Sequence, residues 1–194
     1  LGGVCVNTCY AGLARHLLTG TDVKIITVVG FPLGADRSEV KALATKLAVD
    51  EDHVDEVDMV MNMSAFKSGN YDGVVEDIAA VVEAAKPYAV KVIIETCLLT
   101  DEEKVKACEL VAKGGAAFVK TSTGFSKGGA TLHDAEILAR EAKRYGIGVK
   151  AAGGIRDYET AKAMIAAGAD RIGTSAGVAI CEDEAKAMGG GLPK

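Results

Sequence analysis

Seven short segments rich in Val and Ile alternate with amphipathic stretches along the 194-residue chain, and this alternation predicts an α/β fold of the TIM, or (β/α)8, barrel type. The units recur about every 28 residues, which suits one strand and one helix in each. A doubly wound open sheet is the alternative, but it favours a Gly-rich phosphate loop after its first strand. The sequence contains neither G-x-G-x-x-G nor G-x-x-x-x-G-K-[ST], so we predict the barrel.

The predicted strands are short and apolar, as expected for strands that are buried on both faces of a parallel sheet. They lie at residues 4–7, 23–29, 56–63, 90–96, 117–122, 148–152 and 171–174. Helical periodicity occupies most of the intervening sequence, at residues 8–18, 37–52, 71–86, 101–114, 132–145 and 158–167. Ser38 and Asp101 mark helix starts, and four glycines mark helix ends: Gly20, Gly114, Gly146 and Gly168.

The count of seven units is one short of the eight in a TIM barrel, and the sequence opens at Leu1 almost directly on a strand. We expect the first β/α unit to be missing, which would leave an unpaired strand edge at the barrel seam; a natural seven-unit barrel is the alternative. One domain is expected over residues 1–187, because the chain has the size of an ordinary domain. The Gly-rich residues 188–194 are expected to form a flexible tail.

Composition narrows the class of protein. Apolar residues make up 49% of the chain and charged residues 25%, which is ordinary for a globular protein and excludes a disordered one. A net charge of −5 argues against nucleic acid as a main partner. The longest apolar runs, of about five to seven residues, are too short to span a membrane, and no signal-peptide pattern opens the sequence. The five cysteines are odd in number and scattered, so we expect reduced thiols in a cytoplasmic protein.

Strand parity predicts charged side chains inside the barrel. Within 56–63 the odd-numbered positions are apolar, whereas Glu56, Asp58 and Asn62 share the other face with Val60. The apolar face should pack against helices, so the polar face should line the interior. The same alternation directs five later residues inward: Lys91, Glu95, Lys120, Ser122 and Lys150. Charges in an interior are costly unless they pair or take part in chemistry.

Two lysines lie where a barrel active site is expected. Lys120 and Lys150 each end an apolar strand, and active sites of TIM-type barrels lie at the C-terminal ends of the strands. Lys24 and Lys91 lie early in their strands, near the opposite face, where we expect a role in stability.

These residues together indicate Schiff-base chemistry. An unprotonated lysine attacks a carbonyl carbon, and the resulting Schiff base is an electron sink for C–C bond cleavage or formation. Desolvation and a neighbouring cation both favour the unprotonated amine, and Lys150 would supply that cation for Lys120. Asp58 could order a water molecule or move protons. A structural ion pair is the alternative for all three residues.

Glycines cluster after the late strands, where many barrels bind phosphate through loops and a helix N-terminus. Backbone N–H groups can approach an anion closely at glycine, although ordinary tight turns are the alternative. We also expect Cys5 and Asn7 to line the pocket, with simple packing as the alternative for Cys5, and Glu95 to pair with a lysine. The glycine cluster consists of Gly124, Gly128, Gly129, Gly153, Gly154, Gly173 and Gly177, with Ser175 as a nearby hydroxyl.

The chain resembles the deoxyribose-phosphate aldolase family in six segments, at 30–35 (GFPLGA), 56–62 (EVDMVMN), 92–96 (VIIET), 119–125 (VKTSTGF), 149–156 (VKAAGGIR) and 171–177 (RIGTSAG). The resemblance extends from about residue 3 to residue 180. It implies a class I aldolase that reversibly cleaves 2-deoxy-D-ribose 5-phosphate to acetaldehyde and D-glyceraldehyde 3-phosphate, in the catabolism of deoxyribonucleotides and carbohydrates.

By this resemblance Lys120 is the Schiff-base lysine, Lys150 is the second lysine that tunes it, and Asp58 is the proton-relay aspartate. The family implies no cofactor and no metal. The expected partners are a small phosphorylated sugar and acetaldehyde, and a homodimer is one expectation because family members are often dimeric. Six further residues match substrate and phosphate contacts: Thr123, Gly124, Gly153, Gly154, Gly173 and Ser175.

The chain departs from the family in two places. The family's N-terminal segment of the Asp-His-Thr-Leu-Leu type is absent, and Ala176 stands where the family often has Ser. Two alternatives for the function stay open. One is a related Schiff-base aldolase that acts on another phosphosugar. The other, motivated by the first departure, is a non-catalytic or incomplete barrel that binds phosphosugars.

Overall fold

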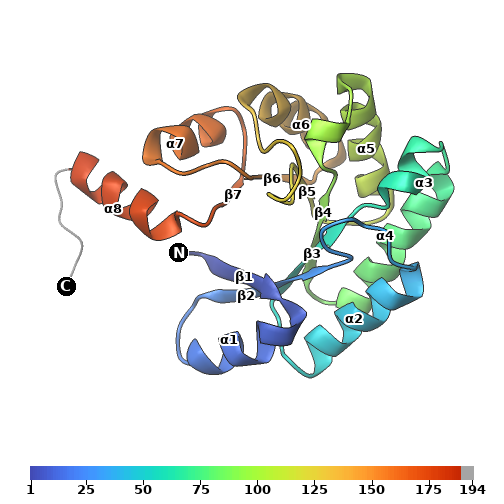
Figure 1. Ribbon diagram of the computed structural model, residues 1–194, viewed down its shortest axis with the longest axis horizontal. Helices are drawn as coiled ribbons and strands as arrows, with labels where there is room; N and C mark the ends of the chain where they lie inside the picture. The colour runs from blue at the N-terminus through green and yellow to red at the C-terminus, as the bar shows by residue number, and fades with distance from the viewer. Residues whose placement is uncertain (189–194) are drawn as a thin grey trace.

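Seven parallel strands form one curled sheet in the computed structural model, which describes residues 1–188 (Figure 1). Each strand pairs with the next one along the chain, which confirms the α/β class with a parallel sheet. The predicted tail lies outside the described residues except for Met188. The strands are β1 (Gly3–Asn7), β2 (Lys24–Val29), β3 (Glu56–Val60), β4 (Ala89–Ile93), β5 (Phe118–Lys120), β6 (Gly148–Ala152) and β7 (Arg171–Gly173).

Helices cover the outer face of the sheet (Figure 1). None of those in the described part of the chain combines the length and the apolar character that a membrane-spanning helix needs. Two 3-10 turns follow β1 and β4, η1 (Thr8–Tyr10) and η2 (Thr96–Leu98). The α-helices are α1 (Ala11–Leu17), α2 (Ser38–Asp50), α3 (Met63–Lys67), α4 (Tyr71–Ala85), α5 (Asp101–Lys113), α6 (Leu132–Tyr145), α7 (Tyr158–Ala166) and α8 (Gly177–Ala187).

Three strands end two or more residues before the sequence predicts. The predicted strands 56–63, 90–96 and 117–122 end at Val60, Ile93 and Lys120. Met61 is fully buried although it lies beyond the strand, so apolar sequence continues into a buried loop and hides the strand end. The C-terminal ends of the strands are therefore the part of the sheet that periodicity locates least well.

Helix starts follow local capping chemistry. The side chain of Asn62 accepts a hydrogen bond from the Ala65 backbone N–H and begins α3, a short helix that the sequence analysis does not predict. Helix α5 begins at Asp101 as predicted, but its cap is Thr100, which forms a capping box with Glu103. Helix α8 was likewise not predicted.

The parity prediction is confirmed within the strands. Val57 and Met59 of β3 belong to the main apolar core, together with Ile78 and Val81 of α4. The five charged strand residues that parity directs inward are all buried: Glu56, Asp58, Lys91, Lys120 and Lys150. The prediction fails beyond the strand ends, because Asn62 caps α3 and Glu95 has a left-handed backbone.

The loop between β2 and α2 is held against the end of β3. Lys41 of α2 is fully buried, and its ammonium group donates to the Val60 carbonyl oxygen (3.2 Å) and to Asp77 (2.6 Å). Gly34 has a φ of +70°, and a Cβ atom there would lie 2.0 Å from the Met61 carbonyl oxygen. The close approach at Gly34 therefore fixes where this loop stands at the mouth of the barrel.

Replacing Gly34 with Ala should destabilise the fold severely. The positive φ costs an alanine about 1–2 kcal/mol, and the collision with backbone atoms adds to it, so we expect a total loss of more than about 3 kcal/mol. Gly20→Ala is the matched control, because Gly20 has a φ of +82° and no atom of the described chain lies within 4 Å of a Cβ built there. Urea denaturation followed by circular dichroism measures both, and equal losses would contradict the packing argument.

Candidate active site

A cavity of about 620 Å³ opens at the C-terminal ends of the strands. Its walls come from β1, β5, β6 and β7 and from the loops that follow them. Cys5 and Asn7 line it as expected, and so do Lys120 and Lys150. All six residues matched to substrate contacts line it as well: Thr123, Gly124, Gly153, Gly154, Gly173 and Ser175.

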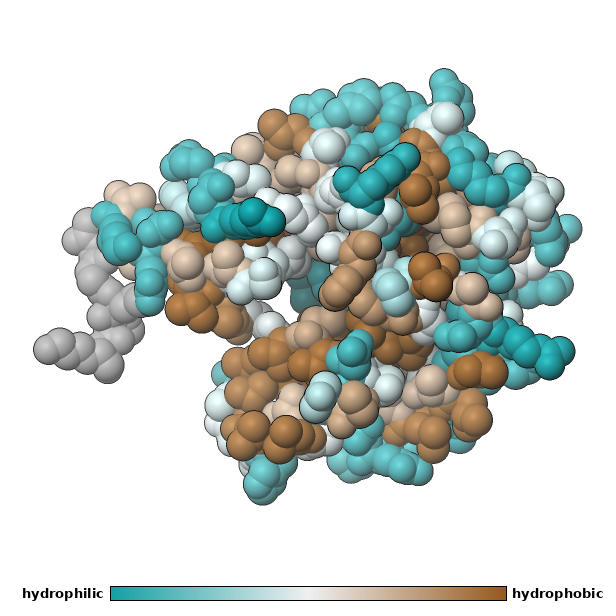
Figure 2. Space-filling view, in the orientation of Figure 1, coloured by the Kyte–Doolittle hydropathy of each residue, from teal (hydrophilic) through white to brown (hydrophobic). Residues whose placement is uncertain are grey.

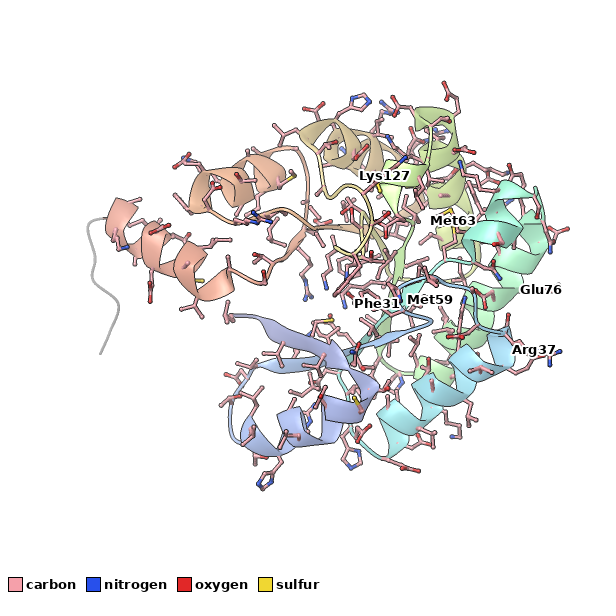
Figure 3. The ribbon with its side chains drawn as sticks, viewed as in Figure 1. Phe31, Arg37, Met59, Met63, Glu76 and Lys127 are labelled. Atoms are coloured by element: carbon pink, nitrogen blue, oxygen red, sulfur yellow. The ribbon has the colours of Figure 1, made fainter. Side chains whose placement is uncertain are left out.

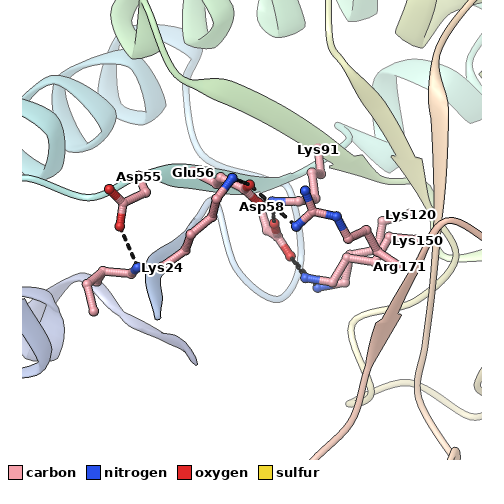
Figure 4. A network of polar contacts seen from close by, with 9 residues as sticks. Lys24, Asp55, Glu56, Asp58, Lys91, Lys120, Lys150 and Arg171 are labelled. Carbon is pink, nitrogen blue, oxygen red and sulfur yellow. Dashed lines mark hydrogen bonds and ion pairs between the residues drawn. The ribbon is translucent and has the colours of Figure 1, made fainter. Parts of the chain in front are cut away.

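Asp58 lies beneath the cavity and joins the two lysines (Figure 4). Its Oδ2 atom accepts hydrogen bonds from Nζ of Lys120 and Nζ of Lys150, each at 2.7 Å. The two nitrogens are therefore no farther apart than twice that distance. Lys120 and Lys150 are partners in the register of β5 and β6, so their side chains emerge side by side on the same face.

The electrostatics of this cluster keep Asp58 ionised. Burial by itself would raise the pKa of Asp58, but the ammonium groups of Lys120, Lys150 and Lys91 lower it well below its usual range. Desolvation and the charge of Asp58 raise the pKa of the Cys5 thiol above its ordinary value. At neutral pH the floor of the cavity thus holds a carboxylate, amino groups and an uncharged thiol.

The loops after β5, β6 and β7 expose backbone to the cavity. Gly124, Gly153 and Gly154 all have positive φ, between +81° and +89°, a conformation that other residues rarely adopt. The loops pack together closely: a Cβ atom on Gly129 would lie 2.3 Å from the Gly153 carbonyl oxygen. Helix α8 begins at Gly177, just after the loop of β7. This arrangement of glycines beside a helix N-terminus can accept an anion.

Glu95 pairs with no lysine in residues 1–188, so that expectation is wrong. Its carboxylate accepts hydrogen bonds from the hydroxyl and the backbone N–H of Thr123. The cause is backbone geometry, because Glu95 has a φ of +52° just after β4 and so departs from strand parity. The Thr123 hydroxyl in turn accepts from the Phe125 N–H at 3.1 Å, so Glu95 braces the loop that carries Gly124.

The expected separation of Lys91 from the site is also wrong. Lys91 is fully buried, and its Nζ atom lies 3.0 Å from Oδ1 of Asp58. The strand spans Ala89–Ile93, so Lys91 is the middle residue of β4 and not an early one, and it is the register partner of Asp58 on β3. Ser122 is buried as predicted, and its hydroxyl has no hydrogen-bond partner among the described residues.

Sequence reasoning missed several residues of the cavity wall. Phe31 and Phe125 form an edge-to-face pair with ring centroids 5.4 Å apart, and both line the cavity. Figure 3 shows Phe31 toward the middle of the barrel. Arg156 also lines the cavity, on the loop after β6. All three residues lie in segments that carry the family resemblance, but single loop residues have no periodicity that would single them out.

Comparisons with known proteins agree with this geometry. A family model described as DeoC/LacD family aldolase matches residues 4–183. A protein of Clostridium tetani named deoxyribose-phosphate aldolase is 60% identical over 93% of this chain and 83% of its own length. The solved structure of QR15, an aldolase, superposes with a TM-score of 0.92 at 45% identity, over 97% of this chain and 83% of that one.

A second solved structure extends the similarity to a more distant relative. It is a deoxyribose phosphate aldolase from Aeropyrum pernix, described as a unique tetramer. It has a TM-score of 0.87 at 33% identity, over 95% of this chain and 77% of that one. The cavity, the lysine pair and these similarities lead to one assignment: the chain belongs to the DeoC/LacD family of aldolases.

Proposed function

We propose that this chain is a class I aldolase that reversibly cleaves 2-deoxy-D-ribose 5-phosphate to acetaldehyde and D-glyceraldehyde 3-phosphate. The observation that carries the proposal is the pair of lysine amino groups, on Lys120 and Lys150, that share one oxygen of a buried carboxylate under the cavity. We infer the substrate from the name of the 60% identical relative, deoxyribose-phosphate aldolase.

The reaction uses Lys120 as the nucleophile. Its amine adds to C1 of the open-chain sugar, and the carbinolamine loses water to form an iminium ion. A base removes the proton from the C3 hydroxyl, the C2–C3 bond breaks, and its electron pair moves into the iminium to give an enamine. Glyceraldehyde 3-phosphate leaves. Protonation of the enamine at C2 and hydrolysis of the new iminium ion release acetaldehyde and restore the amine.

Asp58 and Lys150 manage the protons in this scheme. Because Asp58 remains anionic, it accepts hydrogen bonds and orients both amino groups rather than acting as an acid of its own. The ammonium group of Lys150 disfavours a second positive charge on Lys120 and can pass a proton to or from the substrate. A water molecule ordered in the cavity would complete the path to the C3 hydroxyl.

The phosphate of the substrate would bind on the glycine-rich wall of the cavity. Gly153, Gly154, Gly173 and Ser175 line that wall and offer backbone N–H groups and a hydroxyl. Arg156 adds a positive charge on the same wall. Placing the phosphate there leaves the sugar chain to extend toward Lys120.

We propose that the curled sheet is a TIM-type barrel with room for one further strand between β7 and β1. Among the described residues these two strands pair on one side only, and a second cavity of about 530 Å³ lies between them. Residues 1–187 would then fold as one domain. A single cooperative unfolding transition tests the one-domain part, and two resolved transitions would contradict it.

We also propose a self-associating protein in the cytoplasm. Val40, Leu43 and Leu47 are exposed along one face of α2, and Leu13 and Leu17 are exposed on α1; Figure 2 shows apolar side chains over both helices. Such patches mark interfaces between subunits.

The proposed location in the cytoplasm rests on the cysteines, because the five free thiols suit a reducing compartment. Sedimentation equilibrium of the wild type and of Leu43→Glu tests the association, and a monomeric wild type would reject it; cell fractionation tests the location.

Lys120→Met should abolish turnover while the fold stays intact. The variant lacks the nucleophile, so cleavage of 2-deoxy-D-ribose 5-phosphate should fall by at least about 10⁴-fold. The wild type treated with acetaldehyde and borohydride should carry a reduced two-carbon adduct on Lys120, located by peptide mass mapping. Lys46→Met, an exposed lysine of α2, is the control and should keep full activity and the adduct. An adduct on another lysine, or a folded Lys120→Met that turns over, would refute the assignment.

Arg156→Gln should weaken binding of the phosphate group alone. We expect KM for the phosphorylated sugar to rise about tenfold, because a charge-assisted hydrogen bond is lost, while cleavage of unphosphorylated 2-deoxyribose stays unchanged. Arg144→Gln, an exposed arginine of α6, is the matched control and should leave both reactions unchanged. An equal effect of Arg156→Gln on both substrates would place the phosphate elsewhere. Assays with other sugar phosphates test the substrate itself.

A further inference from the structure

A line of alternating charges runs through the barrel from solvent to the cavity floor (Figure 4). Lys24 of β2, nearly half exposed, donates to Oε1 of Glu56 at 2.7 Å. Oε2 of Glu56 lies 2.5 Å from Nζ of Lys91, and Lys91 donates to Oδ1 of Asp58 at 3.0 Å. The other oxygen of Asp58, Oδ2, accepts hydrogen bonds from Nζ of Lys120 and Nζ of Lys150. Neither Lys91 nor Glu56 is among the described residues that line the 620 Å³ cavity; Lys91 is fully buried and borders only the neighbouring cavity between β7 and β1.

Stability by itself gives no reason for these charges. Burying an ion pair costs about as much as its attraction returns, and apolar side chains of the same volume are often at least as stable. Lys91 and Asp58 are both fully buried, so neither is solvated at its own position. What distinguishes this pair from an ordinary buried salt bridge is that its carboxylate is the one that holds the cavity lysines.

The charges in this cluster do not balance. When all are ionised, Lys91, Lys120 and Lys150 carry three positive charges against two negative ones on Glu56 and Asp58. Release of one proton from a cavity lysine brings the cluster to neutrality. Without the charge on Lys91 these groups would already be neutral with both cavity lysines protonated, and only the repulsion between Lys120 and Lys150 would remain within the cluster to favour the free amine.

We propose that Lys91 is a positioning residue for the aldol chemistry: it holds Oδ1 of Asp58 and supplies the excess positive charge that makes Lys120 release its proton. Glu56 opposes part of that charge and keeps Lys91 in place. The inference rests on the proposed function, because it concerns how the Schiff-base lysine becomes a nucleophile.

Three further polar groups face the cluster from neighbouring strands. Cys5 on β1 is an uncharged thiol at neutral pH, since its pKa is raised. Arg171 on β7 lies 3.5 Å from Glu56 with a partly exposed side chain, and Lys24 on β2 is also partly exposed. Solvent screens these two charges more than the buried ones. The excess positive charge that acts most strongly on Asp58 and on the cavity lysines therefore comes from Lys91, Lys120 and Lys150 themselves.

The test is the pH dependence of Schiff-base formation on Lys120. The protein is treated with acetaldehyde and cyanoborohydride at a series of pH values, and the adduct on Lys120 is quantified by peptide mass mapping. Lys91→Met should move the acid limb of this profile to higher pH by about one unit, since one buried charge is lost. Glu56→Gln should move it to lower pH, because it removes a negative charge. KM for the sugar phosphate should stay within about twofold in both variants, as neither residue lines the cavity.

Lys41→Met is the matched control, because Lys41 is equally buried and paired with a carboxylate, Asp77, but lies outside the barrel interior. It should cost stability and leave the limb in place. A folded Lys91→Met with an unmoved limb, or shifts of the same sign in Lys91→Met and Glu56→Gln, would overturn the inference. If Lys91→Met does not fold, Glu56→Gln becomes the test. An acid limb that does not move in Glu56→Gln, or that moves to higher pH, then rejects the inference. Failure of the wild type to form an adduct on Lys120 would instead reject the proposed function.

Discussion

One buried carboxylate among three lysines is the interaction on which the rest of the structure depends. Asp58 can remain charged away from water because Lys91, Lys120 and Lys150 occupy both of its oxygens. Burial opposes ionisation of Asp58 and Glu56, but their ion pairs lower both pKa values. Their contribution to stability is therefore present above the unfolded-state pKa values, near 4, and is lost as pH falls through the folded values.

The carboxylate needs a parallel sheet to bring its partners together. The lysines come from β4, β5 and β6, separated along the sequence by tens of residues, and a curled parallel sheet places them around one point. The strands thus supply a rigid polar floor, whereas the loops above them supply the walls of the cavity. Different interactions hold the two parts of the cavity. Ion pairs between strand residues hold the floor, whereas close backbone packing at glycines such as Gly34 and Gly153 holds the loops of the walls.

Sequence patterns predict the strand residues of the cavity floor better than the loop residues of its walls. Parity with period two directed the charged residues inward, and the structure agrees, because alternation is a property of any extended strand. The positions of Lys91 and Glu95 were misjudged, each for a geometric reason. Strand β4 spans Ala89–Ile93, so Lys91 is its middle residue and faces Asp58 in register, and a left-handed backbone turns Glu95 away from the lysines toward Thr123. Neither the exact bounds of a strand nor a single unusual φ can be read from periodicity.

The sequence by itself determined the α/β class, the order of the strands and the set of chemistry-bearing residues, because these follow from local periodicity and from motifs of consecutive residues. The tertiary structure decided which of those residues contact one another. Lys120 and Lys150 meet at a single oxygen of Asp58, Lys91 contacts its other oxygen, and Phe31 and Phe125 pack edge to face in the cavity wall. All three arrangements depend on contacts between distant segments. Such contacts are fixed by the curvature of the sheet and by packing in three dimensions, which no local pattern encodes.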